Sequence, residues 1–278
     1  MGTSDISAAS VIVLPICYEA APSYGAGSGE GAFHLLNASV ELEAMDEETF
    51  RDWTRAGVFT VPPVSPEGDP ETVVAEIRRM AAGYLETGKF LLSLGGDHAI
   101  TIGLAGAAVD VFPEIGVLQI DAHLDLREEW HGSRNNHACV MRRLADDFHI
   151  PFVQVGIRSF SAEEAEYIKT NAIYPFFAHD IDPLDHSWMD AAIDRLPETV
   201  YLTLDLDGLD PAFVPGTGTP EPGGLSYRQV VELIRRLGRR RKVIAADINE
   251  LAKIPGSQVS EFTAAKLATK MFVHFLNF

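Results

Sequence analysis

The sequence of 278 residues has little of several features that mark common protein classes. It contains only two cysteines, Cys17 and Cys139, which argues against a disulfide scaffold and favours a reducing, cytoplasmic environment. No apolar run reaches the roughly 18 residues needed to cross a bilayer, so a membrane protein is not expected. Residues 1–10 lack the basic and apolar regions of a secretory signal, and we predict that they form a short flexible leader.

Basic residues are also scarce, since 22 lysines and arginines face 40 acidic residues and the net charge is −18. This excess of negative charge disfavours a nucleic acid or an anionic membrane as a partner. Most of it is consistent with a solvated acidic surface, and it also favours a small cationic substrate. The length and the 46% hydrophobic content predict one large domain over residues 11–278.

Short apolar runs alternate with amphipathic stretches along the chain, which is typical of an α/β protein with a doubly wound parallel sheet. Six runs predict strands, at 11–16, 90–96, 115–122, 151–157, 200–207 and 242–248. Weaker strand candidates at 39–45 and 172–178 bring the number to eight. Helical patterns cover 70–88, 161–170, 226–240 and 261–276, and another helix is expected from about residue 138.

Acids and histidines follow three of the predicted strands at the point where each strand ends. They are Asp97 and His98 in "GGDH", Asp121, His123 and Asp125 in "DAHLD", and Asp205, Asp207 and Asp210 in "DLDGLDP". Ligands of parallel α/β sheets bind beyond the carboxyl ends of the strands. We therefore expect these three clusters to meet at one edge of the sheet.

Each cluster alone has a simple structural interpretation, such as a tight turn, a helix cap or an exposed strand end. Together, however, four aspartates brought into one site would repel one another strongly. Two divalent cations supply +4 against the −4 of Asp121, Asp125, Asp205 and Asp207. Carboxylate and imidazole ligands without thiolate favour Mn²⁺, with Fe, Co, Ni or Zn as alternatives. Two such metals can share a hydroxide and so generate a nucleophile at neutral pH.

The ordered motifs "GGDH", "DAHLD", "DLDGLDP", "GTGTPEPGGLS" and "DINELA" resemble those of the ureohydrolase (arginase/agmatinase) family. The resemblance covers nearly the whole chain and is closest in pattern to bacterial and archaeal agmatinases. It implies a three-layer α/β/α fold with an eight-stranded, mainly parallel sheet and a site for two Mn²⁺ ions. It also implies release of urea from a guanidino compound and assembly into a homo-oligomer, a trimer or a hexamer.

The resemblance implies two sets of metal ligands that share two bridging carboxylates. The sets are His98, Asp121, Asp125 and Asp205 for one ion, and His123, Asp121, Asp205 and Asp207 for the other. Asp97 and Asp210 match the motifs but are not ligands in the family. We expect those two acids to cap turns or to orient a ligand.

Three catalytic roles follow from the same resemblance. His137 matches the histidine that shuttles protons, with His131 as the competing candidate. Glu250 matches the glutamate that binds the guanidinium through charge-assisted hydrogen bonds, although the preceding Asn249 departs from the usual Val-Glu-Val. Asp125 is expected to pass a proton to the leaving amine.

The loop "LREEWHGSRNNHAC" carries the substrate prediction, because it resembles the agmatinase version of this segment. Glu128 is expected to attract the second cationic end of agmatine, and Asn135 to contact the substrate at a spacing that arginases use. The N-terminal segment 22–39 lacks the arginines and prolines usual in the family. Hydrolysis of agmatine to putrescine and urea is therefore the predicted reaction.

Several alternatives stay open at this point. Arginine, guanidinobutyrate, guanidinopropionate, formiminoglutamate and guanidine are other possible substrates, and Arg127 or Arg134 could pair with a carboxylate on the substrate. A different class of hypothesis is a non-catalytic, metal-binding regulatory homologue, and a third is a deacetylase-type relative with one zinc. The complete double ligand set argues against both.

Overall fold

The computed structural model describes residue 3, residues 5–20 and residues 22–278. Within them the chain forms an eight-stranded, all-parallel sheet with the order β2-β1-β3-β8-β7-β4-β5-β6. The strands are β1 (Val11–Pro15), β2 (Val58–Thr60), β3 (Phe90–Leu94), β4 (Ile115–Ile120), β5 (Phe152–Ile157), β6 (Phe176–Phe177), β7 (Thr199–Asp205) and β8 (Lys242–Asn249). The predicted α/β fold with an eight-stranded parallel sheet is confirmed.

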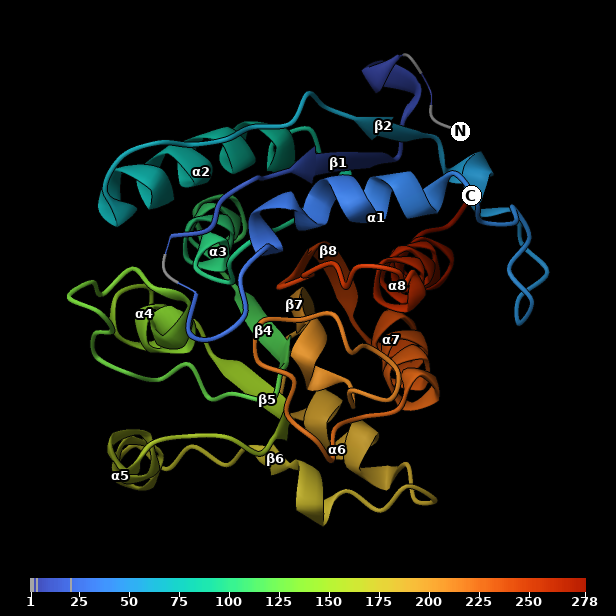
Figure 1. Ribbon diagram of the computed structural model, residues 1–278. Coiled ribbons are helices and arrows are strands. Elements are labelled where there is room, and N and C mark those ends of the chain that lie inside the picture. Colours follow the sequence, from blue (N-terminus) through green and yellow to red (C-terminus); the bar gives the residue numbers. More distant parts are fainter. Residues whose placement is uncertain (1–2, 4, 21) are drawn as a thin grey trace.

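Helices cover both faces of this sheet, as Figure 1 shows. They are α1 (Gly31–Ser39), α2 (Pro70–Leu85), α3 (Ile100–Val111), α4 (Val140–Asp146), α5 (Ala162–Thr170), α6 (Ser187–Asp194), α7 (Tyr227–Arg240) and α8 (Val259–Phe275). One hydrophobic core lies between the sheet and α1, α6, α7 and α8, and the other between the sheet and α2, α3 and α4. The molecule therefore has the three layers α/β/α.

Burial on both faces explains why the strands are almost wholly apolar. In β1, Val11 and Val13 enter the first core while Ile12 and Leu14 enter the second. Side chains alternate between the two faces of a strand, so a strand covered on both sides needs apolar residues at every position. The central strands thus form a rigid platform whose carboxyl edge is free to carry polar residues.

Helix α2 shows how the sequence sets a helix boundary. Asp69 caps it by accepting a hydrogen bond from the Thr72 amide (2.9 Å), and Pro70 occupies the first turn as predicted. The buried residues Val73, Ile77, Ala81 and Leu85 repeat every four positions and form one apolar stripe. The helix ends at Leu85, before Gly88, which adopts a left-handed conformation.

Some predicted elements were wrong. Residues 39–45 form no strand, because they contain the last residue of α1 and the turn after it. The strand of the sheet that 39–45 was predicted to supply is instead the short edge strand β2. The weak candidate at 172–178 contains only the two-residue β6. Helices α1, α3 and α6 were not predicted. Helix α3 is nearly all apolar, so it shows no amphipathic period.

The predicted leader, residues 1–10, lies partly outside the described residues, which omit 1, 2 and 4. Within it, Ile6–Ala8 forms one 3-10 turn, and Ala9 is buried. Flexibility of this segment stays a prediction.

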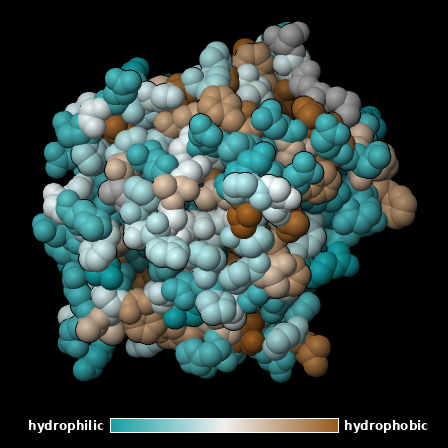
Figure 2. Space-filling view, viewed as in Figure 1, coloured by the Kyte–Doolittle hydropathy of each residue, from teal (hydrophilic) through white to brown (hydrophobic). Residues whose placement is uncertain are grey.

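The surface seen in Figure 2 is mostly hydrophilic, with hydrophobic residues scattered across it. The most exposed large hydrophobic residues, Leu184 and Tyr24, lie far apart in sequence. Among the helices of the described chain, none has both the length and the hydrophobicity needed to span a membrane.

Candidate metal centre and active site

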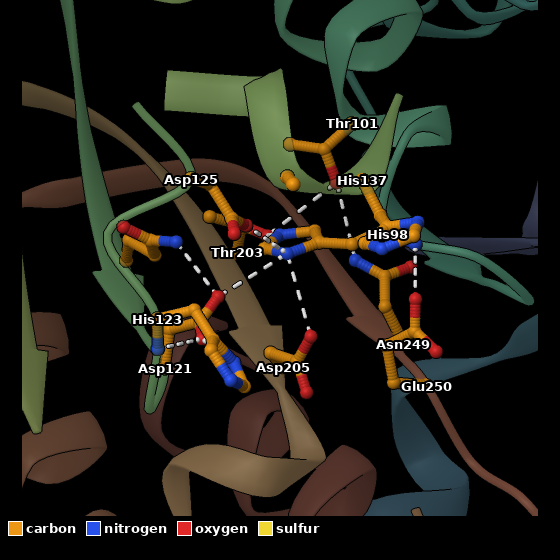
Figure 3. Close-up of polar contacts among 12 residues, drawn as sticks. His98, Thr101, Asp121, His123, Asp125, His137, Thr203, Asp205, Asn249 and Glu250 are labelled. Atoms are coloured by element: carbon orange, nitrogen blue, oxygen red, sulfur yellow. Dashed lines mark hydrogen bonds and ion pairs between the residues drawn. The ribbon is translucent and has the colours of Figure 1, made fainter. Parts of the chain in front are cut away.

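The six predicted metal ligands and Glu250 meet at the carboxyl edge of four neighbouring strands, β3, β8, β7 and β4. Register brings them together, because Leu94 pairs with Ile248, Asp205 with Asn249, and Ile120 with Leu204. The residues that follow these pairs therefore lie side by side although they are far apart in sequence. The expectation that three clusters meet at one edge is confirmed (Figure 3).

The two glycines of "GGDH" are required by close packing behind the site. A Cβ atom on Gly95 would overlap the side-chain oxygen of Asn249, and one on Gly96 would overlap the carbonyl oxygen of Tyr18. Only glycine fits at these two positions. This close approach places His98 against the ends of the central strands.

The first ligand group surrounds the ring of His98, which is buried. Its Nδ1 atom lies 3.2 Å from a carboxylate oxygen of Asp121, 3.0 Å from one of Asp125 and 3.4 Å from one of Asp205. These residues come from three strand ends, so the group forms only in the folded sheet. All four predicted ligands of the first metal are together.

Hydrogen bonds behind His98 fix which ring nitrogen faces the carboxylates. Its Nε2 atom lies 2.8 Å from the Thr203 hydroxyl, which donates in turn to Asp247 at 2.7 Å. Asp247 is fully buried and also accepts hydrogen bonds from Thr101, Tyr201 and the Asn249 amide. Such a network sets the tautomer and the orientation of a metal-binding histidine.

The second ligand group lies beside the first and shares Asp121 with it. Here the Nδ1 atom of His123 is 3.1 Å from an Asp207 oxygen and 3.5 Å from an Asp121 oxygen. The carboxylate of Asp207 is held by the Ala122 amide and the Thr219 hydroxyl. A carboxylate common to two groups is the arrangement expected of a ligand that bridges two metals.

The electrostatics of this edge are unfavourable for so many carboxylates. Burial and the charge of Asp121 raise the pKa of Asp125 to about 7, and burial together with Asp207 and Asp121 raises that of Asp205. Burial lowers the pKa of His98 and His123, but the surrounding carboxylates outweigh it and raise both. The histidines only partly neutralise the four aspartates, so a further positive charge is needed.

Divalent metals fit this donor set. The Nδ1 atom of His98 is buried and has no hydrogen-bond partner among the described residues, although three carboxylates surround it. Buried polar atoms rarely stay unpaired, and a metal between the ring nitrogen and the carboxylates would satisfy both. Neutral imidazoles and carboxylates suit Mn²⁺ and its neighbours in the first transition row.

Two site residues hold unusual backbone conformations. Asp125 has φ of 52° and Glu250 has φ of 63°, a left-handed region that side chains other than glycine rarely adopt. Such strain often accompanies function, because the surrounding structure must enforce it. One oxygen of Glu250 accepts a hydrogen bond from the His98 amide (2.7 Å), which ties the glutamate to the first ligand group.

His137 lies at the side of the site nearest to the N-terminal loop. Its Nε2 atom is 2.8 Å from the Ser23 hydroxyl, and its Nδ1 atom is 3.8 Å from Asp97. Burial lowers the pKa of His137, but Asp97 outweighs it and raises the pKa overall. The competing candidate His131 is exposed and does not line the same cavity.

A cavity of about 260 Å³ opens over both ligand groups and is called the first cavity below. It contains Glu250, His137 and Asp125 in its wall. Several of its lining residues were not among the predicted site residues, including Glu19, Ser23, Trp130, Phe160, Glu164 and Thr219. For Thr219 the motif "GTGT" was a signal, and Glu164 was visible as part of a helix-capping pattern with Ser161.

Comparison with known proteins agrees with this geometry. The family model of the arginase family matches residues 9–274, which is nearly the whole chain. The chain belongs to the arginase family. Members of this family have a binuclear metal site, and this chain has two histidine–aspartate groups whose ligand atoms lie close enough together to hold metal ions.

Individual members of the arginase family are similar over almost their full length. An N(1)-aminopropylagmatine ureohydrolase of Synechocystis is 41% identical over 271 residues, covering 95% of this chain and 88% of that protein. An agmatinase of Pyrococcus horikoshii is 33% identical, covering 95% and 92%. The crystal structure of agmatine ureohydrolase of Thermoplasma volcanium matches with a TM-score of 0.89 and 29% identity, covering 99% of this chain and 92% of that one.

Two residues predicted to bind substrate are not brought into the first cavity. Glu128 points to the outside of the loop, where its carboxylate pairs with Arg134, Arg142 and Arg143. Asn135 lines a neighbouring cavity instead. The structure does not bring Glu128 into the first cavity, because sequence spacing does not show which way a loop residue points.

Other acids and bases of the motifs have structural partners. Asp210 caps a turn by accepting hydrogen bonds from the amides of Ala212 and Gly223, as expected. Arg127 lines the first cavity, but its guanidinium stacks on the Trp130 ring at 4.1 Å and lies 4.0 Å from Glu164. Arg127 is therefore already paired within the protein.

Proposed function

We propose that this chain is a metal-dependent ureohydrolase that cleaves a guanidino compound to urea and an amine. The observation that carries the proposal is the pair of ligand groups sharing Asp121, with Glu250 in the same cavity. A family whose members include agmatinases and an aminopropylagmatine ureohydrolase supports the same reaction.

The six predicted ligands would hold two ions, for which we propose Mn²⁺. His98 and Asp125 would serve one ion and His123 and Asp207 the other, with Asp121 and Asp205 shared between them. When bound, such ions polarise the substrate and lower the pKa of water, so that a nucleophile forms at neutral pH.

The residues around the metals have separate tasks. The Glu250 carboxylate would bind the guanidinium and fix its orientation, since one of its oxygens is already held by the His98 amide. Asp125 would deliver a proton to the nitrogen that leaves as the amine. His137, in contact with Ser23 at the mouth of the cavity, would exchange protons with solvent.

A guanidino amine such as agmatine is the substrate class that we propose, because it has cations at both ends and no carboxylate. The first cavity contains the carboxylates of Glu19, Asp97 and Glu164 in addition to the ligands. Among the described residues in its wall, Arg127 is the one lysine or arginine, and it is paired with Glu164 and Trp130. Arginine or a guanidino acid would bring a carboxylate into this acidic cavity, which costs Coulomb energy.

A longer guanidino amine, N(1)-aminopropylagmatine, is the second candidate. The Synechocystis relative is named for this compound, and it is more similar to the chain than the Pyrococcus agmatinase is. Both candidates place a guanidinium at Glu250 and differ only at the far end of the amine.

Urea release by the manganese-loaded protein tests the proposal. The substrates compared are agmatine, aminopropylagmatine, arginine, guanidinobutyrate, guanidinopropionate and guanidine. We expect the highest kcat/KM for one of the two guanidino amines. Preference for arginine or a guanidino acid would overturn the substrate class, and release of urea from none of them would overturn the reaction.

We also propose a cytoplasmic homo-oligomer, a trimer or a hexamer, on the strength of family resemblance and the two free cysteines. Sedimentation of the purified protein would measure the number of chains.

A further inference from the structure

A second cavity, of about 600 Å³, lies next to the first. Glu19, Asp97 and Trp130 line both cavities, so the two cavities adjoin at these side chains. Glu19 is held at this boundary because its carboxylate accepts hydrogen bonds from the amides of Gly27 (2.8 Å) and Gly29 (3.4 Å). The roles proposed above for the reaction leave the second cavity without a use.

The lining of the second cavity suits a cationic chain with methylene groups. Tyr18, Pro66, Pro70 and Trp130 supply apolar surface. Glu67 adds a carboxylate to those at the boundary, and no lysine or arginine is present among the described residues that line this cavity. Alkyl amines bind in this way, with the stem on apolar surface and the ammonium at an acceptor.

Two acceptors in the second cavity have no partner in the part of the chain that the structure describes. The carboxylate of Glu67, from the loop after β2, makes no hydrogen bond or ion pair there, and neither does the side-chain amide of Asn135. Glu128 shows the contrast, since its carboxylate is fully engaged by three arginines. Glu67, which is exposed, and Asn135, which is half-buried, thus line one cavity from two separate loops, and both side chains are available to a ligand.

We propose that the second cavity binds the aminopropyl end of a triamine-length guanidino substrate, with Glu67 and Asn135 as acceptors for its terminal ammonium. This inference rests on the proposed ureohydrolase function and names the substrate class within it. Glu19, at the boundary, faces the inner amine that agmatine also has. The aminopropyl group adds about 5 Å of extended chain, which carries the terminal ammonium from the first cavity into the second.

The reaction is the same for both substrate lengths. Water adds to the guanidinium carbon, the bond from that carbon to the substituted nitrogen breaks, and the nitrogen takes the proton to leave as an ammonium. The products are urea and a diamine from agmatine, or urea and the triamine spermidine from aminopropylagmatine. Only the triamine product carries an ammonium that reaches the second cavity.

The test compares kcat/KM for aminopropylagmatine and for agmatine in the manganese-loaded protein and two variants. Glu67→Gln keeps the shape of the side chain and removes its charge, and Asn135→Ala removes the amide acceptor. Glu114→Gln is the matched control, because Glu114 is an exposed acid just before β4, at the opposite edge of the sheet. Inhibition by spermidine and by putrescine is measured in parallel as a binding readout.

We expect the unmodified protein to prefer aminopropylagmatine. In Glu67→Gln the ratio of the two kcat/KM values falls by about tenfold, mainly through KM, and spermidine inhibition weakens by a similar factor. Asn135→Ala lowers the ratio by a smaller factor, about threefold. The control leaves the ratio unchanged.

Three outcomes would overturn the inference. An unmodified protein that hydrolyses agmatine but not aminopropylagmatine would refute it and leave the proposed function standing. Equal losses on both substrates in Glu67→Gln would place that residue outside a subsite for the aminopropyl group. Absence of urea from either substrate would refute the proposed function together with this inference.

Discussion

Two acidic clusters of this molecule differ in the source of their positive charge. In the first, Asp46, Glu47 and Glu48 surround the buried ammonium of Lys270, whose Nζ atom lies 2.5, 2.9 and 3.2 Å from their respective carboxylates. In the second, four aspartates meet at the carboxyl edge of the sheet, and no lysine or arginine forms an ion pair with them among the described residues.

The pKa values follow this difference. Burial raises the pKa of Asp46, but hydrogen bonds from Lys270 and Thr49 outweigh it and lower the pKa to about 2. At the sheet edge, burial and the charge of Asp121 raise the pKa of Asp125 to about 7. Burial and the charge of Asp97 raise the pKa of Glu250 to about 8. A cluster that carries its own cation is a structural element, whereas one that lacks it is built to receive cations from solution.

The largest effect is expected from removing the carboxylate that both ligand groups share. Asp121→Asn should lower kcat/KM for urea release by roughly a thousandfold or more, because several kcal/mol of metal-assisted stabilisation are lost. Metal content per chain and urea formation measure the change. Asp210→Asn is the control, since Asp210 belongs to the same set of motifs but caps a turn. Full activity and two bound metals in Asp121→Asn would contradict the assignment.

The next effect concerns the other cluster and should appear in stability alone. Lys270→Met leaves three carboxylates without their cation and should lower the free energy of unfolding by about 3 kcal/mol. Denaturant titration gives that value, while metal analysis should still find two ions per chain. Loss of metal without loss of stability would show that the two clusters are not independent.

Acid should weaken the contribution of the Lys270 cluster to stability, because the pKa of Asp46 is lowered there. Its folded-state pKa lies below the ordinary value of 3.8. The contribution of Asp46 to the free energy of unfolding is therefore complete above about pH 4 and is lost as the pH falls toward about 2. The expected loss is about 2 kcal/mol at most. Unfolding curves between pH 5 and pH 2 should show this slope in the unmodified protein and a smaller one in Lys270→Met. Equal slopes in both proteins would count against the ion pair.

The smallest effect is expected from an isosteric change in the metal-free protein. Burial and neighbouring carboxylates raise the pKa of Asp205, so its ionised form destabilises the fold above its ordinary pKa and most of all at alkaline pH. Asp205→Asn removes that charge and can still accept the hydrogen bond from the Asp207 amide (2.9 Å). Stability at pH 8 with a chelator present should rise by about 1 kcal/mol, whereas Asp46→Asn should lower it. A decrease in stability in both Asp205→Asn and Asp46→Asn would contradict the proposed difference between the two clusters.

The sequence predicted the central part of the fold and the gathering of the site residues because both depend on local patterns. All strands of a parallel sheet end at a common edge. The position of an acid or histidine that follows a strand can therefore be predicted. The strand β2 escaped prediction since it has only three residues, and α3 because its apolar residues lie on all sides. Edge strands and fully buried helices lack the periodicity on which such predictions depend.

Loop residues could not be placed in the same way. Glu128 and Asn135 lie in the segment that the motifs assigned to substrate binding, but one faces three arginines and the other a second cavity. Their directions depend on partners such as Arg142, on α4, and Glu163, whose carboxylate holds the Glu128 amide. These contacts are long-range and leave no pattern in the local sequence.

The position of β8 in the middle of the sheet determines when the site can exist during synthesis. All six proposed ligands have been translated by residue 207, yet β3 and β7 are joined only through β8, which is made about 40 residues later and so emerges several seconds after them. A chain that ends before residue 242 therefore lacks the strand that joins β3, which is followed by His98, to β7, whereas the other five ligands lie at or after the ends of β4 and β7, which pair directly. Pairing of β8 with both strands brings His98 to the other ligands, so the first ligand group can be complete only after the C-terminal strand has been made.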